Sequence, residues 1–173
     1  QLSRNDYQKA AQLTLKLNPR LSKREKNALW GRLGYVAALN HDPKALLWYS
    51  KGEKEVCYGP YMAHPEACLE WRIRTALRQS QWEKVVQLIN QLPGPLKEKD
   101  VWHYWKGYAL KQQGFKSSAE KEFQKLTNVR TFYGKLAAEQ LKQRIVYRTN
   151  GTTVAPKERV DLISKDQSIP VSY

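Results

Sequence analysis

Few residues in this sequence have the types and spacing that catalysis requires. The three histidines, His41, His64 and His103, lie in different segments, and no Ser/His/Asp or Cys/His arrangement accompanies them. The nine glycines are scattered singly, so no glycine-rich phosphate-binding loop is expected. Glycoside cleavage needs a Glu in an apolar pocket, and Glu70, beside Trp71, is the local candidate, although a solvated helix position is the favoured interpretation. The sequence therefore predicts binding rather than catalysis, with no catalytic residue and no cofactor.

Two cysteines, Cys57 and Cys68, flank the insert YGPYMAHPEA and allow two interpretations. Ten intervening residues could close a loop, and a disulfide in an oxidising compartment would stabilise the fold by about 2–3 kcal/mol. In a reducing compartment two ordinary thiols are expected, and the spacing leaves both alternatives open. His64 lies between the cysteines, but no fourth ligand has suitable spacing, so we expect no zinc site.

Positive charge is the clearest indication of a binding function. The chain has 30 Lys and Arg against 16 Asp and Glu, a formal net charge of +14, and half of this excess falls between residues 106 and 148. Such a surface attracts polyanions, whether nucleic acid, anionic lipid or an acidic cell-wall polymer. The candidate face for a substrate or partner consists of five residues: His103, Tyr104, Lys106, Lys111 and Lys135.

The run Trp102 to Trp105 limits how this face can be arranged. Successive residues of a helix are about 100° apart, so all four cannot face the core. If Trp102 and Trp105 pack inward, His103 and Tyr104 point sideways or outward. Tyr104 could instead pack into the next helix pair without contacting a ligand. The lysines could instead form an ordinary solvated helix face.

Helical spacing of apolar residues predicts the elements that position these side chains. A capping box at Ser22 and Glu25 begins one helix, and Pro43 and Pro65 are each expected at the first position of another. The predicted helices cover residues 6–17, 22–40, 43–50, a segment beginning at 65, 81–92, and three further segments between 92 and 141. No run of about 18 apolar residues is present, so no membrane span is expected.

An internal repeat with a period of 33–34 residues links the later helices. Its matching positions are Trp71 with Trp105, Ala76 with Ala109, Trp82 with Phe115, and turns near Ser80 and Gly114. Such a period, built from helix pairs, is typical of tetratricopeptide-like proteins. It predicts an all-α fold, a right-handed superhelix of antiparallel helix pairs forming a tetratricopeptide-like α-solenoid, with an irregular C-terminal tail.

The predicted organisation has two parts. Residues 1–143 are assigned to the α-superhelical domain, and residues 144–173, which contain Pro156 and Pro170 and few large apolar residues, to an extended tail or the start of a linker domain. Large aromatic residues are expected to hold the helices together through packing: Trp71, Trp82, Trp102, Trp105, Phe123, Phe132 and Tyr133.

Ordered motifs between residues 69 and 141 carry a family resemblance. LEWRIRTALRQSQWEKVVQLINQLP is followed by KEKDVWHYWKGYAL, GFKSSAEKEFQKL and FYGKLAAEQL. This order resembles the end of the superhelical U-shaped domain of the soluble lytic murein transglycosylases. The resemblance implies a periplasmic, peptidoglycan-cleaving lyase of a Gram-negative bacterium, which acts in murein turnover and leaves 1,6-anhydro ends.

In that family catalysis belongs to a separate C-terminal lysozyme-like domain, with a Glu followed by Ser and a downstream Gly-Leu-Met-Gln motif. None of the eleven glutamates here is followed by Ser. The resemblance thus implies a scaffold segment, inactive alone, that guides or holds peptidoglycan or positions the catalytic domain. Its implied partners are peptidoglycan, that catalytic domain and other cell-wall proteins, and a signal peptide is presumed removed or outside this chain.

The resemblance also affects the remaining alternatives. An oxidising periplasm favours the disulfide between Cys57 and Cys68. Two other functions stay open: a helical-repeat adaptor that binds a protein, and a basic nucleic-acid-binding solenoid. The sequence lacks regular pairs of side chains that could recognise one RNA base per repeat. This argues against a repeat protein that recognises RNA sequence in that way.

Overall fold

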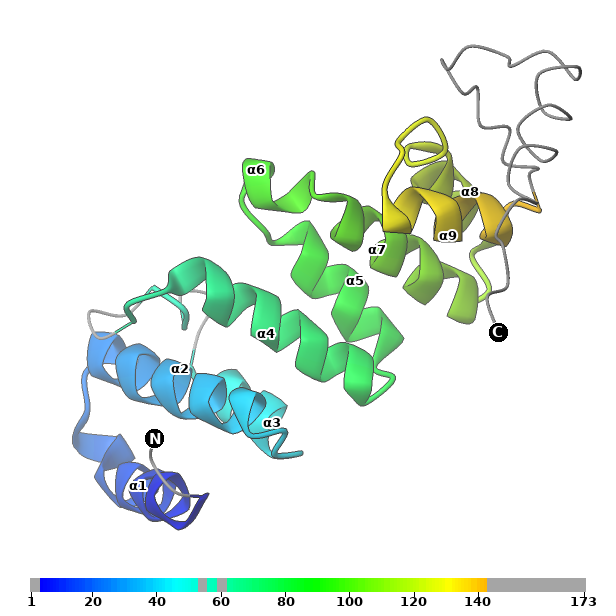
Figure 1. Ribbon diagram of the computed structural model, residues 1–173. Coiled ribbons are helices and arrows are strands. Elements are labelled where there is room, and N and C mark those ends of the chain that lie inside the picture. The colour runs from blue at the N-terminus through cyan, green and yellow to red at the C-terminus, as the bar shows by residue number, and fades with distance from the viewer. Residues whose placement is uncertain (1–3, 53–55, 59–61, 143–173) are drawn as a thin grey trace, which may run out of the picture.

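The computed structural model describes residues 4–52, 56–58 and 62–142, and its regular elements are helices throughout these ranges (Figure 1). The predicted all-α class is therefore confirmed. The predicted tail, residues 144–173, lies outside the described residues, so its character and the domain boundary at residue 143 stay predictions.

The helices follow one another with short connections. Their bounds are α1 Arg4–Leu17, a 3-10 turn at Asn18–Arg20, α2 Lys23–Leu39, α3 Ala45–Ser50, α4 Pro65–Arg78, α5 Trp82–Asn90, α6 Gly94–Lys97, α7 Asp100–Gln112, α8 Lys116–Gln124 and α9 Phe132–Gln140. The short helix α6 and the 3-10 turn are elements that the sequence pattern did not predict.

Two helix beginnings test the sequence rules for caps. At α2 the capping box is confirmed, because Glu25 N donates to Ser22 Oγ at 3.3 Å and Ser22 N donates to Glu25 Oε2 at 2.8 Å. At α3 the prediction that Pro43 is the first helical residue is wrong. The Asp42 carboxylate accepts a hydrogen bond from Lys44 N at 2.8 Å, which forms a turn over these residues and delays the helix to Ala45.

The same left-handed turn ends α2, α4 and α7. It is centred on a residue with positive φ, at His41 (59°), Ser80 (53°) and Gly114 (87°). The residue after each centre donates its N–H to a carbonyl five residues back: Asp42 to Ala37 at 2.9 Å, Gln81 to Ala76 at 3.0 Å and Phe115 to Leu110 at 3.0 Å. This is the Schellman arrangement, which satisfies free carbonyls at a helix end. The turns predicted near Ser80 and Gly114 are confirmed, and His41 marks an earlier copy.

Three helix pairs follow from these turns: α2 with α3, α4 with α5, and α7 with α8. Each pair packs against the next, and α1 and α9 lie at opposite ends of the array (Figure 1). The extensive contacts join neighbouring elements, as expected when no helix can bury its apolar stripe alone. The right-handed superhelix predicted from the repeat stays a prediction.

Aromatic side chains lie at the centre of the two hydrophobic clusters, one from α1 to α7 and one from α7 to α9. Trp102 and Phe123 are buried, and Trp105 packs against both clusters. Trp71, Trp82, Trp105 and Tyr133 are half-buried. The prediction that Phe132 packs into the structure is wrong, since its side chain is 67% exposed. Phe132 is the first residue of α9, directly after the cap Thr131, and its ring contacts the neighbouring Tyr133 ring at 5.3 Å between centroids.

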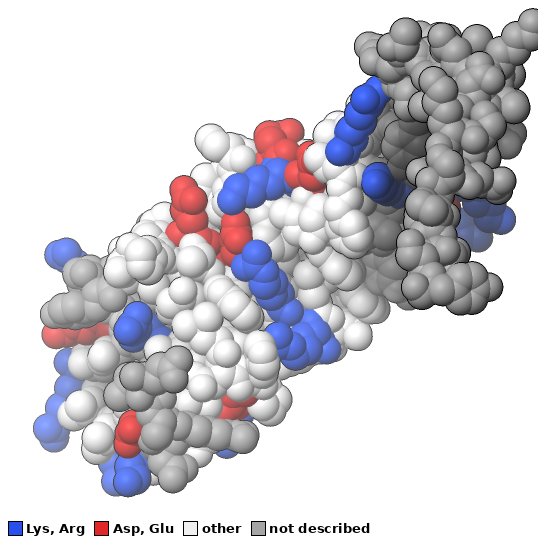
Figure 2. All heavy atoms as spheres, viewed as in Figure 1, with Lys and Arg blue, Asp and Glu red and all other residues white. Residues whose placement is uncertain are grey.

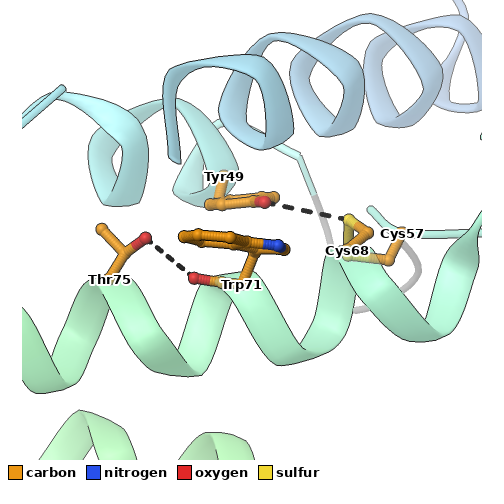
Figure 3. Close-up of a disulfide and its surroundings, with 5 residues drawn as sticks. All are labelled: Tyr49, Cys57, Cys68, Trp71 and Thr75. Carbon is orange, nitrogen blue, oxygen red and sulfur yellow. Dashed lines mark hydrogen bonds between the residues drawn. A yellow bond between two sulfur atoms is a disulfide. The ribbon is translucent and has the colours of Figure 1, made fainter. Parts of the chain in front are cut away.

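A disulfide joins Cys57 to Cys68 and thereby ties the segment after α3 to α4 (Figure 3). Both cysteines are fully buried. The Tyr49 ring of α3 covers this part of α4, with its hydroxyl oxygen 4.0 Å from Cys68 Sγ. The alternative of two free thiols, left open by the spacing, does not apply to this structure.

Removal of the disulfide should destabilise the protein. Because the crosslink restricts the unfolded chain, we expect the double variant Cys57→Ala and Cys68→Ala to lose about 2–3 kcal/mol of unfolding free energy in urea melts. Reductant should lower the stability of the wild type by a comparable amount and leave the double variant unchanged. An equal response of both proteins to reductant would contradict this.

A second prediction concerns how α9 docks. A Cβ on Gly134 would overlap the backbone carbonyl oxygens of Val129 and Leu126, which cannot move without distorting the preceding turn. Gly134→Ala should therefore cost about 1–3 kcal/mol of unfolding free energy, as other overpacked sites do. Gly94→Ala is the matched control, since nothing lies within 4 Å of the added Cβ. Equal urea midpoints for the two variants would refute the close approach.

Candidate ligand-binding surface

Two residues of the predicted face, His103 and Lys106, form part of an internal charge cluster. Glu122 of α8 accepts a hydrogen bond from His103 Nδ1 at 2.9 Å, and it pairs with Lys106 Nζ at 2.9 Å and Lys125 Nζ at 3.0 Å. His103 is 9% exposed, so the prediction that it points sideways or outward is wrong. The cluster joins α7 to α8, and the Lys106 ammonium is neutralised by the Glu122 carboxylate.

The pKa of Glu122 reflects these contacts. Burial raises the pKa, but hydrogen bonds from His103, Lys106 and Lys125 outweigh burial and lower it from 4.5 to about 2. Glu122 is therefore ionised at neutral pH and cannot serve as a general acid. Its role in the structure is to hold two helices together.

Tyr104 is also an interior residue. Its side chain is 6% exposed, and its ring centroid lies 5.4 Å from Trp105, 5.8 Å from Phe123 and 5.6 Å from Tyr133. The prediction of a sideways or outward orientation is wrong, and the alternative of packing into the next helix pair describes what is found. The reason is that α7 contacts α5, α8 and α9, so more than one side of this helix is covered.

Half-buried rings extend from α5 to α9 on either side of Tyr104, and we call Trp82, Trp105, Tyr108 and Tyr133 the aromatic row. The centroids of Trp82 and Tyr108 lie 5.6 Å apart, as do those of Trp105 and Tyr108. Tyr104 contacts Tyr108 at 6.4 Å and Tyr133 at 5.6 Å and so connects the row to α9. The rings belong to three helices, yet they form one continuous series of contacts.

Lys111 differs from Lys106 in how its charge is used. Its Nζ donates to the neutral Gln140 amide oxygen of α9 at 2.8 Å. Within the described part of the chain Lys111 has no carboxylate partner, and it is exposed. It follows Tyr104 and Tyr108 at helical spacing, so the three lie on one stripe of α7. Lys135 is exposed on α9. Whether these residues face a substrate or partner stays a prediction.

Glu70, the candidate acid for glycoside cleavage, is held as a paired carboxylate. Its oxygens accept hydrogen bonds from Arg74 and Lys99, each at 2.9 Å, and its side chain is 17% exposed. Burial raises the pKa of Glu70, but the two hydrogen bonds outweigh burial and lower it. The Arg74 guanidinium also lies 5.5 Å from the ring centroids of Trp71 and Trp102. Glu70 is thus neither a solvated residue nor a carboxylic acid ready to donate a proton.

Other classes of site are not found among the described residues. No group of three or more His, Cys, Asp or Glu there could hold a metal ion. None of the helices described is long and apolar enough to cross a membrane. The aromatic row and Lys111 form the candidate surface for a ligand.

The Glu122 cluster predicts a dependence of stability on acid pH. The carboxyl pKa is lower in the folded protein, so folding favours the ionised form, and its contribution is lost as pH falls from about 4.5 to about 2. Glu122→Gln should flatten the fall in melting temperature across this range, because the variant has no proton to take up. Glu120→Gln is the control, since Glu120 is exposed on the same helix. Identical pH profiles for the two variants would contradict the assignment.

Comparisons with known proteins place these features in context. No protein-family model matches the chain. Over 73 residues, 42% of this chain, the sequence is 32% identical to the soluble lytic murein transglycosylase of Escherichia coli strain K12, and equally to that of Escherichia coli O157:H7. The aligned part spans only 11% of the length of these curated relatives.

A solved structure gives broader coverage. The X-ray structure of an inactive mutant of lytic transglycosylase Slt from Pseudomonas aeruginosa matches 82% of this chain with a TM-score of 0.63 and 30% sequence identity. The match covers 22% of that chain. In sequence and in structure, this chain is similar to soluble lytic murein transglycosylases, as its motifs between residues 69 and 141 indicated.

Proposed function

We propose that this chain is a non-catalytic helical scaffold segment of a periplasmic lytic transglycosylase that cleaves peptidoglycan to 1,6-anhydro-muropeptides. The observation that carries the proposal is the likeness to Slt, at 30% identity over 82% of this chain. In this role the segment holds peptidoglycan strands or positions the catalytic domain of the parent enzyme. Its partners are peptidoglycan and a C-terminal lysozyme-like domain.

The chemistry of the described residues supports a scaffold rather than a catalyst. Glu70 and Glu122, two carboxylates that each pair with lysine or arginine side chains, both have lowered pKa values. A glycosidase acid needs the opposite shift, since it must stay protonated near neutral pH. The cleavage step is therefore assigned to another part of the parent enzyme.

The net charge supports binding of an anionic polymer. Figure 2 shows Lys and Arg side chains spread along the face seen in Figure 1, with groups of acidic side chains among them. With a net charge of +14, the chain would be attracted to the carboxylates of peptidoglycan stem peptides. Salt would weaken this attraction by screening it.

Binding and cleavage can be measured separately with purified sacculi. We expect the chain to sediment with sacculi at low salt, to be released as salt rises, and to liberate no 1,6-anhydro-muropeptides on prolonged incubation. A full-length lytic transglycosylase serves as the positive control for cleavage. Release of anhydro-muropeptides by this chain alone would contradict the scaffold role, and failure to sediment at any salt concentration would contradict peptidoglycan binding.

A further inference from the structure

We infer that the aromatic row, together with Lys111, is a carbohydrate-binding surface for a glycan strand that bears carboxylates. The inference rests on the proposed function and deepens it, because it names where the strand lies. The row consists of Trp82, Trp105, Tyr108 and Tyr133, each of which is half-buried. The argument uses the exposure of these rings, their fixed geometry and the charge beside them.

The rings of the row have the form that sugar recognition requires. A pyranose presents a face of C–H groups that packs on an aromatic ring, while its hydroxyl groups need water or polar partners. Trp and Tyr suit this contact, because each combines a large apolar body with a polar tip. A ring in the core could not meet a ligand, and a fully exposed ring would have to be ordered on binding. Half-buried rings avoid both difficulties.

The row is also held in place before any ligand arrives. Trp82 and Trp105 each meet Tyr108 edge to face, at interplanar angles of 65° and 76°. Behind them lies Tyr104, which is 6% exposed and contacts Tyr108 and Tyr133. Rings fixed in this way lose little conformational entropy on binding, which favours affinity. The row spans α5, α7 and α9 and so suits an extended strand.

Charge selects an anionic glycan over a neutral one. Lys111 continues the stripe of Tyr104 and Tyr108 on α7, and its hydrogen bond to the Gln140 amide fixes the ammonium without neutralising it. Lys106, one turn earlier on another side of α7, is bound to Glu122 at 2.9 Å and is not available in this way. A carboxylate attached to a sugar on the row would therefore meet Lys111 as its cation.

The experiment uses two soluble probes and four variants of the whole chain. The probes are amidase-treated peptidoglycan strands, which bear lactyl carboxylates, and a neutral chitooligosaccharide. Affinity is measured by calorimetry and by quenching of Trp fluorescence. Tyr108→Ala removes the ring shared by two contacts of the row, and Lys111→Gln removes only charge. The matched controls are Phe115→Ala, a 57% exposed aromatic residue outside the row, and Lys121→Gln, an exposed lysine of α8.

Each variant has a distinct expected result. Tyr108→Ala should bind both probes about threefold to tenfold more weakly, the usual effect of losing one aromatic contact. Lys111→Gln should weaken binding of the carboxylate-bearing strands by a similar factor and leave the neutral probe unchanged. Both controls should bind as the wild type does. If Tyr108→Ala fails to fold in thermal melts, Trp82→Leu at the first position of α5 replaces it, with the same expected loss.

The outcomes that overturn the inference differ from those that overturn the proposed function. If the wild type binds the strands and both row variants match their controls, this surface is not the site, although peptidoglycan binding stands. If the wild type binds neither probe nor sacculi, peptidoglycan binding itself fails. If Lys121→Gln weakens binding as much as Lys111→Gln, the charge effect is unspecific. If an oligonucleotide displaces the strands at lower concentration, the row recognises nucleic acid instead.

Discussion

The left-handed turn at the end of the first helix of each pair is the constraint on which this structure depends. It reverses the chain at His41, Ser80 and Gly114, with the same hydrogen bonds each time. Because the turn fixes where the second helix begins, the apolar stripes of the two helices face each other. Of these three residues, Gly114 adopts positive φ without steric cost, whereas at His41 and Ser80 the two carbonyl bonds of the turn stabilise the strained backbone. Stacking then continues from pair to pair.

Much of this fold was predictable because its signals are local. The capping box of Ser22 and Glu25, the helix start at Pro65 and the repeat of turns at Ser80 and Gly114 all depend on residues close in sequence. The sequence repeat did not reveal the first helix pair. The insert that carries Cys57 lengthens the interval between the first and second pairs, so their positions do not match at a period of 33–34 residues. The spacing of Cys57 and Cys68 allowed a disulfide but could not exclude two free thiols, because disulfide formation also depends on whether the compartment is oxidising.

The candidate site was less predictable, because its contacts are between distant residues. The run from Trp102 to Trp105 indicated a helix with two inward rings, but α7 is covered on several sides, and His103 and Tyr104 are buried as well. Nothing local indicates that Glu122, nineteen residues on from His103, would pair with it. Lys106 pairs with Glu122, whereas Lys111 has no carboxylate partner among the described residues, and this distinction likewise depends on the neighbouring helices. Helical spacing from Tyr104 through Tyr108 to Lys111 was the one available signal.

The contacts between neighbouring layers have a mechanical consequence. In the described part of the chain the extensive contacts join each helix to those beside it, and no single core ties both ends together. A small rotation at each interface therefore adds up along the array, and curvature can change while every local hydrogen bond is kept. Such an array is elastic in bending but resists shortening of its individual helices. If the segment holds a glycan strand as proposed, this compliance would let it follow a strand whose path changes.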